Sequence, residues 1–232
     1  MASPVLHSAV LDTLGMRITS GELAPGAVLT LEGLRQEFGV SRTVMREVMR
    51  LLESMNLVLS RRRVGLVVRP SDEWRVFDPR VIRWRLDGPG RDAQLRTLTD
   101  LRSAVEPLAA AGAARHATDA DRERIVELAA LMRQRGEAGQ LEDFLELDIE
   151  FHSLLLRASR NEMFAALTEV VAEVLAGRTH HGLMPKPPEP VALDLHEEVA
   201  RSIHAGADRD AESAMRGLVE EVRAAFADET AN

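Results

Sequence analysis

The chain has 232 residues, with no cysteine and no tyrosine, and carries 29 Lys and Arg against 37 Asp and Glu, a formal net charge of -8. The absence of cysteine excludes disulfides, thiolate zinc sites and iron–sulfur clusters, so a metal could bind only to histidines and carboxylates. No apolar run reaches the roughly 18 residues of a membrane span, and the first residues do not resemble a signal peptide. We expect a cytoplasmic protein of one large or two small domains, and its acidic balance argues at first against a nucleic-acid partner.

The charge is distributed unevenly along the chain. Residues 1–72 carry 9 Arg and 7 acidic residues, whereas residues 73–232 carry 20 basic and 30 acidic ones. The basic excess is largest within residues 41–72, with 7 Arg against 3 acidic residues. A basic segment joined to an acidic body indicates a separate nucleic-acid-binding module, although chance clustering on a solvated surface would give the same counts.

The first 72 residues predict the element order of a winged helix-turn-helix domain. An amphipathic helix is predicted over residues 6–20, and a short helix follows Thr30. After a glycine turn, Ser41 is placed to cap a third helix over residues 42–55. Two β-like runs around a basic turn then predict a hairpin, at residues 57–60 and 66–69.

The third predicted helix has an arginine face and an opposite apolar face. Arg42, Arg46 and Arg50 lie within about 80° of one another on a helical wheel, as in a helix that packs on a core and faces phosphates. In a helix-turn-helix the start of the second helix reaches base edges in the major groove, where Arg42 or Arg46 would read guanine. Ser41 and Thr43 lie at the helix N-terminus, where backbone N–H groups bind phosphate. The alternative is a solvated helix with an exposed arginine turn.

The predicted hairpin supplies further candidate DNA contacts. Its turn residues suit the DNA backbone or minor groove, and a glycine permits close approach: Arg61, Arg62, Arg63 and Gly65. After the hairpin, residues 73–92 contain both tryptophans, which a purely flexible linker rarely holds, so we expect an ordered linker or arm. Residues 93–232 show helical periodicity almost throughout and predict an all-α bundle of about six helices.

Four polar residues of the predicted bundle lie on otherwise apolar helix faces: Arg102, Asp148, His152 and His196. Asp148 and His152 are four residues apart, so a helix presents them on adjacent turns, and a histidine with a carboxylate suits zinc or a similar divalent metal. Each residue alone is more often a satisfied polar group of the core. All four together favour an internal polar cavity, because burying them without partners would be costly.

The segment FGVSRTVMREVMRLLESMNLV, residues 38–58, closely resembles the helix-turn-helix of GntR-family transcriptional regulators. The most similar branch is the fatty-acid-regulator (FadR) type, which has a helical FCD effector domain. By this resemblance, Arg42, Thr43 and Arg46 match DNA-contacting positions, and Gly65 matches the glycine at the tip of the wing. Glu32 stands where many members carry a DNA-contacting arginine, so that contact is not expected here, and Arg35 is an alternative to it.

The body of the chain resembles the metal-binding type of FCD domain. The matching segments are DIEFH, residues 148–152, then ASRN, residues 158–161, and His196 followed by IHAGAD, residues 203–208. In that type an Asp and three His hold a divalent metal beneath the effector, so the resemblance implies Asp148, His152 and His196 as ligands, with zinc the expected ion. Leu218 stands at the fourth position and cannot bind a metal. Either water and effector complete the shell, or the site is weak or empty.

The resemblance also bears on the effector. Arg102 matches a family arginine that grips an anion, and a guanidinium suits a carboxylate. The segment WRVFDPRVIRW, residues 74–84, together with Leu218, is similar to the sugar-acid branch of the family, such as galactonate-operon repressors. This similarity implies an aldonate or a related hydroxy acid as effector.

We therefore expect a DNA-binding regulator and not an enzyme. Residues 93–232 would bind a small carboxylate and form a homodimer, and the ligand would release a repressor from a double-stranded operator palindrome. A metal-dependent hydrolase or lyase is the alternative suggested by the three-ligand site, but Glu150, the nearest candidate base, is predicted to point away. A nonspecific architectural DNA-binding protein, without an effector, is the third hypothesis.

Overall fold

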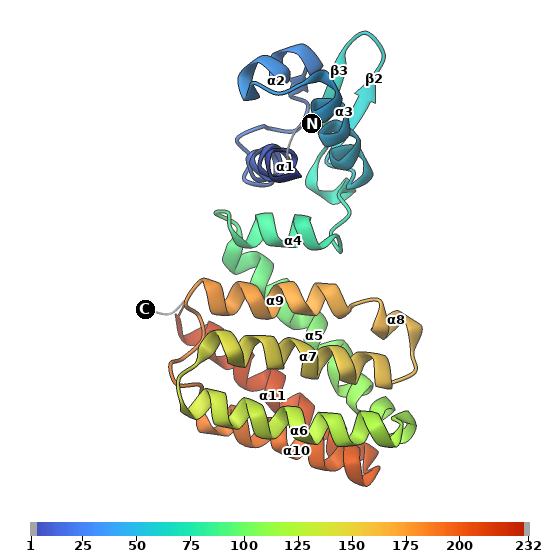
Figure 1. Cartoon of the computed structure of the whole chain (residues 1–232), viewed down its shortest axis with the longest axis vertical. Coiled ribbons are helices and arrows are strands. Elements are labelled where there is room, and N and C mark those ends of the chain that lie inside the picture. The colour runs from blue at the N-terminus through green and yellow to red at the C-terminus, as the bar shows by residue number, and fades with distance from the viewer. Residues whose placement is uncertain (1–3, 230–232) are drawn as a thin grey trace. The chain divides into compact units, whose positions relative to one another are not determined.

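The computed structural model describes residues 4–229, and the side chains of residues 7–223 within them. The ends of the two predicted domains, residues 1–3 and 230–232, lie outside the described residues. The chain divides into two compact units, residues 1–94 and 95–232 (Figure 1). The first contains helices and a small sheet, and the described part of the second contains helices only, which confirms the predicted mainly helical fold.

The N-terminal unit has the element order of a winged helix-turn-helix. Its elements are α1 (Pro4–Thr19), β1 (Val28–Leu29), α2 (Leu31–Phe38), α3 (Arg42–Ser54), β2 (Val58–Arg61), β3 (Gly65–Val68), a 3-10 turn (Ser71–Glu73) and α4 (Pro79–Leu86). Local signals set the boundaries. The hydroxyl of Thr30 accepts a hydrogen bond from the Gly33 N–H at the start of α2, and Gly39 ends that helix with a φ of 63°. Ser41 caps α3 in the same way, as predicted.

The three strands form an antiparallel sheet in the order β1-β3-β2. The predicted hairpin is confirmed, with Ser60 opposite Leu66. The two-residue strand β1 was not predicted, because so short a run carries no alternation of apolar and polar residues. Gly65 joins the wing to β1: its φ is 125°, and a Cβ there would lie 2.5 Å from the carbonyl oxygen of Leu29. A larger residue at this position would therefore separate β1 from β3.

Helix α4 packs on α1 through Trp84. The Trp84 side chain is 2% exposed and lies over Gly15, where a Cβ would come within 2.4 Å of the indole ring. Its Nε1–H donates to Oδ1 of Asp12 at 3.0 Å. Trp74 is tied to the same unit by a hydrogen bond from its Nε1 to the Arg69 carbonyl, 3.0 Å long. The segment predicted to link the domains thus supplies packed residues to the N-terminal unit.

The C-terminal unit is a bundle whose centre is α7. Its helices are α5 (Arg91–His116), α6 (Asp119–Glu137), α7 (Leu141–Ala158), α8 (Glu162–Ala165), α9 (Thr168–His180), α10 (Pro190–Ala205) and α11 (Asp208–Glu229). Helix α7 packs against α6 and α9, and α10 packs against α6 and α11 (Figure 1). Side-chain caps set the starts of two helices: Thr118 forms a capping box with Asp121 at the start of α6, and the Asn161 side chain caps α8.

The apolar core of this bundle surrounds α7. Phe144, Phe151 and Leu155 are each no more than 1% exposed and pack with residues of the neighbouring helices. Two polar residues of α7, Asp148 and His152, are buried among them. No described helix is long and apolar enough to cross a membrane.

Candidate functional site

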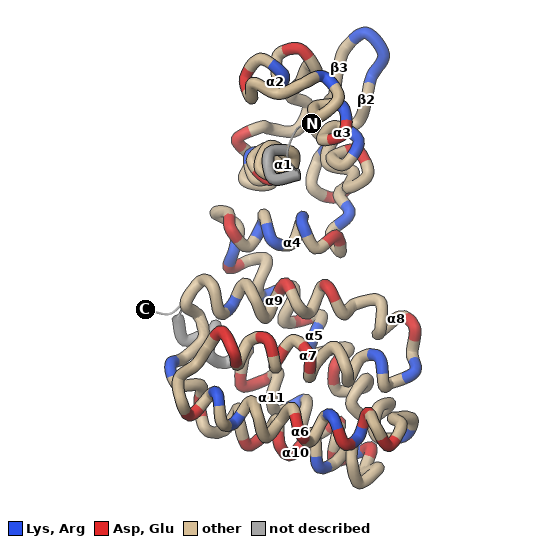
Figure 2. The backbone as a smooth tube through the Cα atoms, in the orientation of Figure 1, with Lys and Arg blue, Asp and Glu red and all other residues tan. Residues whose placement is uncertain are grey.

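The predicted DNA-contacting residues lie on two exposed parts of the N-terminal unit. The first is the exposed face of α3 with its cap Ser41, and the second is the β2–β3 turn with the strand residues that flank it; Figure 2 shows basic residues gathered on both. All but one of these residues are exposed, and Gly65 is half-buried: Ser41, Arg42, Thr43, Arg46, Arg50, Arg61, Arg62, Arg63 and Gly65. The structure therefore groups the predicted residues on α3 and at the wing, with side chains that are accessible to a large partner.

Some of these side chains already have partners within the chain. Arg50 forms an exposed ion pair with Glu47, in which Nη1 lies 3.3 Å from Oε2. Among the described residues, no ion pair engages Arg42 or Arg46, so their guanidinium groups are available for phosphates or bases. Arg35 is held by Glu32, with Nη2 2.7 Å from Oε1, so its use as a DNA contact would require breaking that pair.

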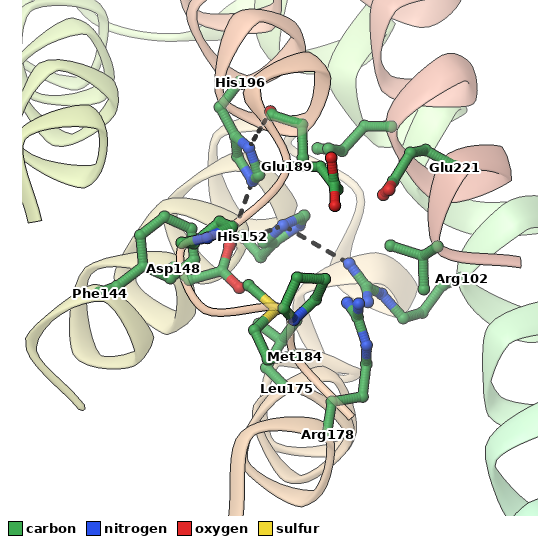
Figure 3. Close-up of a pocket in the computed structure, with 15 residues that line it drawn as sticks. Arg102, Phe144, Asp148, His152, Leu175, Arg178, Met184, Glu189, His196 and Glu221 are labelled. Carbon is green, nitrogen blue, oxygen red and sulfur yellow. Dashed lines mark hydrogen bonds and ion pairs between the residues drawn. The ribbon is translucent and has the colours of Figure 1, made fainter. Parts of the chain in front are cut away.

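The second candidate site is a pocket inside the C-terminal unit (Figure 3). It contains all four polar residues that the sequence placed on apolar faces, and it also contains Leu218. Arg102 comes from α5, Asp148 and His152 from α7, and His196 from α10. The remaining lining residues are Phe144, Leu175, Arg178, Met184, Pro185, Pro188, Glu189, Ala192, Leu218, Glu221 and Val222. The polar cavity expected from the sequence is present.

Asp148, His152 and His196 bring three ligand atoms together. One potential ligand atom from each lies within 4.8 Å of the other two, and all three side chains are buried. Oδ1 of Asp148 is 3.3 Å from Nε2 of His152 and 3.2 Å from Nε2 of His196. Two imidazole nitrogens and a carboxylate oxygen are ordinary ligands of zinc and similar divalent ions.

The hydrogen bonds around His196 favour a cation in this group. Its Nδ1 lies 2.7 Å from the carbonyl oxygen of Ala192, which can only accept, so Nδ1 carries the proton. In the neutral ring Nε2 is then an acceptor, and it faces the acceptor Oδ1 of Asp148. A bound cation would remove this repulsion, and a carbonyl that orients the ring is a common partner of a metal-binding histidine.

A buried carboxylate also lies beside the ring of His152, within ion-pair distance of Nδ1 but not aligned as a hydrogen bond. Nδ1 of His152 lies 3.0 Å from Oε2 of Glu106, which leaves Nε2 turned toward Asp148. Burial alone would lower the pKa of His152, but the charge of Glu106 and the hydrogen bond to Asp148 raise it to about 9. Without a cation, a ring proton occupies the place that a metal would take. The residues present therefore fit a divalent metal with three protein ligands.

The two carboxyl groups are ionised despite their burial. Burial raises the pKa of Asp148, but the contacts of its carboxylate with His152 and His196 outweigh burial and hold that pKa far below its ordinary value. Burial likewise raises the pKa of Glu106, but the charges of Arg102 and His152 lower it to about 2. Both carboxylates thus stay ionised at neutral pH, as a carboxylate ligand of a metal must be.

Arg102 lies beside the three ligand residues and has one unused donor. Its Nε donates to Oε1 of Glu106 at 2.7 Å, and its Nη2 donates to Oε2 at 3.2 Å. Nη2 also lies 3.5 Å from Nε2 of His152. Nη1 is fully buried without a hydrogen-bond partner among the described residues. Because an unpaired buried donor is costly, this atom indicates the position of an acceptor supplied from outside the chain.

Several pocket residues were not singled out from the sequence. Arg178, Glu189 and Glu221 line the pocket, and Glu106 pairs with the pocket residue Arg102 four residues before it on the same helix. The signal for Glu221 is its spacing, since it follows Leu218 by three residues on one helix. Conversely, Glu150 pairs with Arg124, with Oε1 2.8 Å from Nε, and does not line the pocket, as predicted.

Comparisons with known proteins assign both units to one family. Residues 6–68 match the model of bacterial regulatory proteins of the gntR family, and residues 97–221 match the FCD domain. The galactonate operon transcriptional repressor of Escherichia coli K12 is 31% identical over 71% of this chain and 72% of its own length. The regulator LutR of Bacillus subtilis is 28% identical over 85% of this chain and 90% of its own.

Solved structures show the same fold. Escherichia coli McbR/YncC superposes with a TM-score of 0.56 at 19% identity, covering 99% of this chain and 100% of that one. Listeria monocytogenes Lar gives a TM-score of 0.59 at 17% identity, over 98% of this chain and 99% of its own. The matched families and named relatives are regulators, so the hydrolase or lyase hypothesis finds no support. The chain belongs to the GntR family and is a transcriptional regulator with a winged helix-turn-helix and an FCD domain.

Proposed function

We propose that this regulator is a repressor that a small sugar-acid-like carboxylate releases from DNA. The ligand binds in the pocket of the FCD domain, with its carboxylate at Arg102 and at a divalent metal held by Asp148, His152 and His196. The single observation that carries this proposal is the buried, unpartnered Nη1 of Arg102 next to three converging ligand atoms. A relative that represses the galactonate operon supports an aldonate as effector.

Each protein group has a definite part in binding. Arg102 is positioned by Glu106, so that its remaining N–H groups point at an anion without a further loss of side-chain freedom. Zinc is the expected ion, and when bound it supplies open coordination positions for a carboxylate or hydroxyl oxygen, because Leu218 contributes no ligand. Glu106 and the Ala192 carbonyl orient the two histidine rings.

The N-terminal unit supplies DNA recognition. Arg42, Thr43 and Arg46 at the start of α3 enter the major groove, with Ser41 and Arg50 beside the phosphates. Arg61, Arg62, Arg63 and Gly65 bring the wing to the DNA backbone or minor groove. The FCD domain forms a homodimer, and two such heads match a palindromic operator. Release requires that the ligand bind one arrangement of the dimer better than the other.

The test measures DNA binding and release in one titration. Fluorescence anisotropy with labelled DNA from the chain's own upstream region is expected to show tight, sequence-dependent binding that galactonate with zinc reverses. Arg102→Lys is expected to bind DNA normally but to need at least about tenfold more ligand for release, since a lysine ammonium lacks the paired N–H groups with which a guanidinium binds a carboxylate. The matched control is Arg115→Lys, because Arg115 pairs with Asp208 on the surface. DNA binding that no sugar acid alters would refute the proposed effector class.

A further inference from the structure

Two carboxylates line the pocket without a part in the function proposed above. Glu221 on α11 is half-buried, and Glu189, just before α10, is exposed at the rim. Among the described residues, neither carboxylate is engaged by a hydrogen bond or an ion pair. Figure 3 shows both turned toward the pocket, on the side away from Arg178. Besides its two arginines, the pocket therefore holds two carboxylates that can accept hydrogen bonds from a ligand.

The position of Glu221 relates it to the metal ligands. Leu218 and Glu221 are three residues apart on α11, and both line the pocket, so they share one face of the helix. The helical rise places Glu221 about 4.5 Å further along the axis than Leu218. Leu218 occupies the position of the fourth metal ligand in the family pattern. A ligand whose carboxylate lies at the metal and Arg102 would thus carry its far end toward Glu221.

We propose that Glu221, with Glu189 at the rim, selects a hydroxylated monocarboxylate and rejects the dicarboxylate of the same length. An ionised carboxylate only accepts hydrogen bonds, so it pairs with ligand hydroxyl groups and repels a second carboxylate. Arg102 is paired with Glu106 and, in the proposed complex, also binds the first carboxylate of the ligand, so it leaves the charge of Glu221 uncompensated. The inference rests on the proposed function, and it assigns to this pocket an aldonate in preference to an aldarate.

Galactonate and galactarate form a matched pair of probes, since they differ only at C6, where one has an alcohol and the other a carboxylate. Isothermal titration of the full-length, zinc-loaded protein is expected to give at least about tenfold tighter binding of galactonate. In Glu221→Gln the side-chain amide can donate to a carboxylate, so the preference is expected to fall to about threefold or less. Glu221→Asp retains the charge and is expected to retain the preference.

The matched control is Glu220→Gln, which makes the same change on an exposed neighbour that does not line the pocket. This variant is expected to keep the wild-type preference. Because Glu221 has no partner among the described residues, Glu221→Gln is expected to leave the melting temperature of the ligand-free protein unchanged.

Two results would overturn the inference alone, and one would overturn its basis. If wild type binds both acids equally while Arg102→Lys weakens both, the proposed function stands and the role of Glu221 is refuted. If Glu221→Gln keeps the full preference, as the control does, the role of Glu221 is likewise refuted. If neither acid binds the wild-type protein, the proposed effector class fails and the inference fails with it.

Discussion

The substitution Glu106→Gln tests whether the buried charges of the pocket are a paired unit. Glu106 is fully buried and accepts two hydrogen bonds from Arg102, which is 2% exposed, and it faces Nδ1 of His152. Removing one partner of a buried ion pair costs about 3–5 kcal/mol, because the other charge remains uncompensated. The glutamine oxygen still accepts one hydrogen bond, which recovers about 1 kcal/mol. The expected net loss is about 2–4 kcal/mol.

This loss corresponds to a fall of about 4–16 °C in the melting temperature, at about 2–4 °C per kcal/mol for a chain of this size. The assay is thermal unfolding of the metal-free protein, followed by far-ultraviolet circular dichroism. Trp74 and Trp84 both lie in the N-terminal unit, so tryptophan fluorescence follows that unit separately and is expected to change little. The variant should also bind zinc about 10–100-fold more weakly, since a partner that orients His152 is lost.

The control is Glu127→Gln, which removes a carboxylate from an exposed pair. Oε2 of Glu127 lies 2.6 Å from Nη1 of Arg124, and the Glu127 side chain is 59% exposed. Such pairs contribute less than about 1 kcal/mol. If Glu106→Gln lowers the melting temperature no more than this control does, the buried pair of Glu106 and Arg102 stabilises the fold no more than an exposed ion pair, and the reasoning is refuted.

Four further predictions address other parts of the chain. Gly15→Ala should cost about 1–3 kcal/mol, because the new Cβ would lie 2.4 Å from the Trp84 ring, and the midpoint of unfolding followed by tryptophan fluorescence measures it. Arg46→Ala should weaken operator binding by about 1–3 kcal/mol and relax specificity at one base pair, which competition with mutated operators would detect. Leu218→His should tighten zinc binding about tenfold or more, because the new histidine would supply a fourth protein ligand. Titration of zinc against a chelator would measure the affinity, and an unchanged value would mean that residue 218 lies away from the metal. The metal-free protein should lose stability as the pH rises from 6.5 to about 9. The pKa of His152 is about 9 in the folded protein and 6.5 in the unfolded chain, so its stabilising effect is complete below pH 6.5 and is lost by about pH 9. His152→Gln should flatten this pH dependence of the unfolding free energy in urea titrations.

Local signals account for what the sequence predicted well. The caps at Thr30 and Ser41 act within one turn, so their residues alone indicate where helices begin. The spacing of Asp148 and His152 on one apolar face indicated a buried polar pair for the same reason. His196, 48 residues from Asp148, could be joined to them only through the family resemblance and the periodicity of its own helix.

Tertiary packing accounts for what the sequence did not predict. An acidic residue on a helix is usually solvated, so the spacing of Glu221 from Leu218 gains a meaning only once the pocket beside Leu218 is known. Trp84 packs over Gly15 although about seventy residues separate them, and no short-range pattern reports such a contact. The strand β1 exists only because β3 pairs with it.

The attachment of α4 to α1 limits the freedom of the DNA-reading head. With α4 fixed through Trp84, only residues 87–90 separate the last helix of that head from α5, the helix that carries Arg102. Four residues span at most about 14 Å when fully extended, and Pro89 stiffens them further. In the proposed homodimer, connections this short would leave the two DNA-binding domains little freedom to follow a variable half-site spacing. Adding or removing one base pair between the operator half-sites should therefore prevent both DNA-binding domains from binding at the same time.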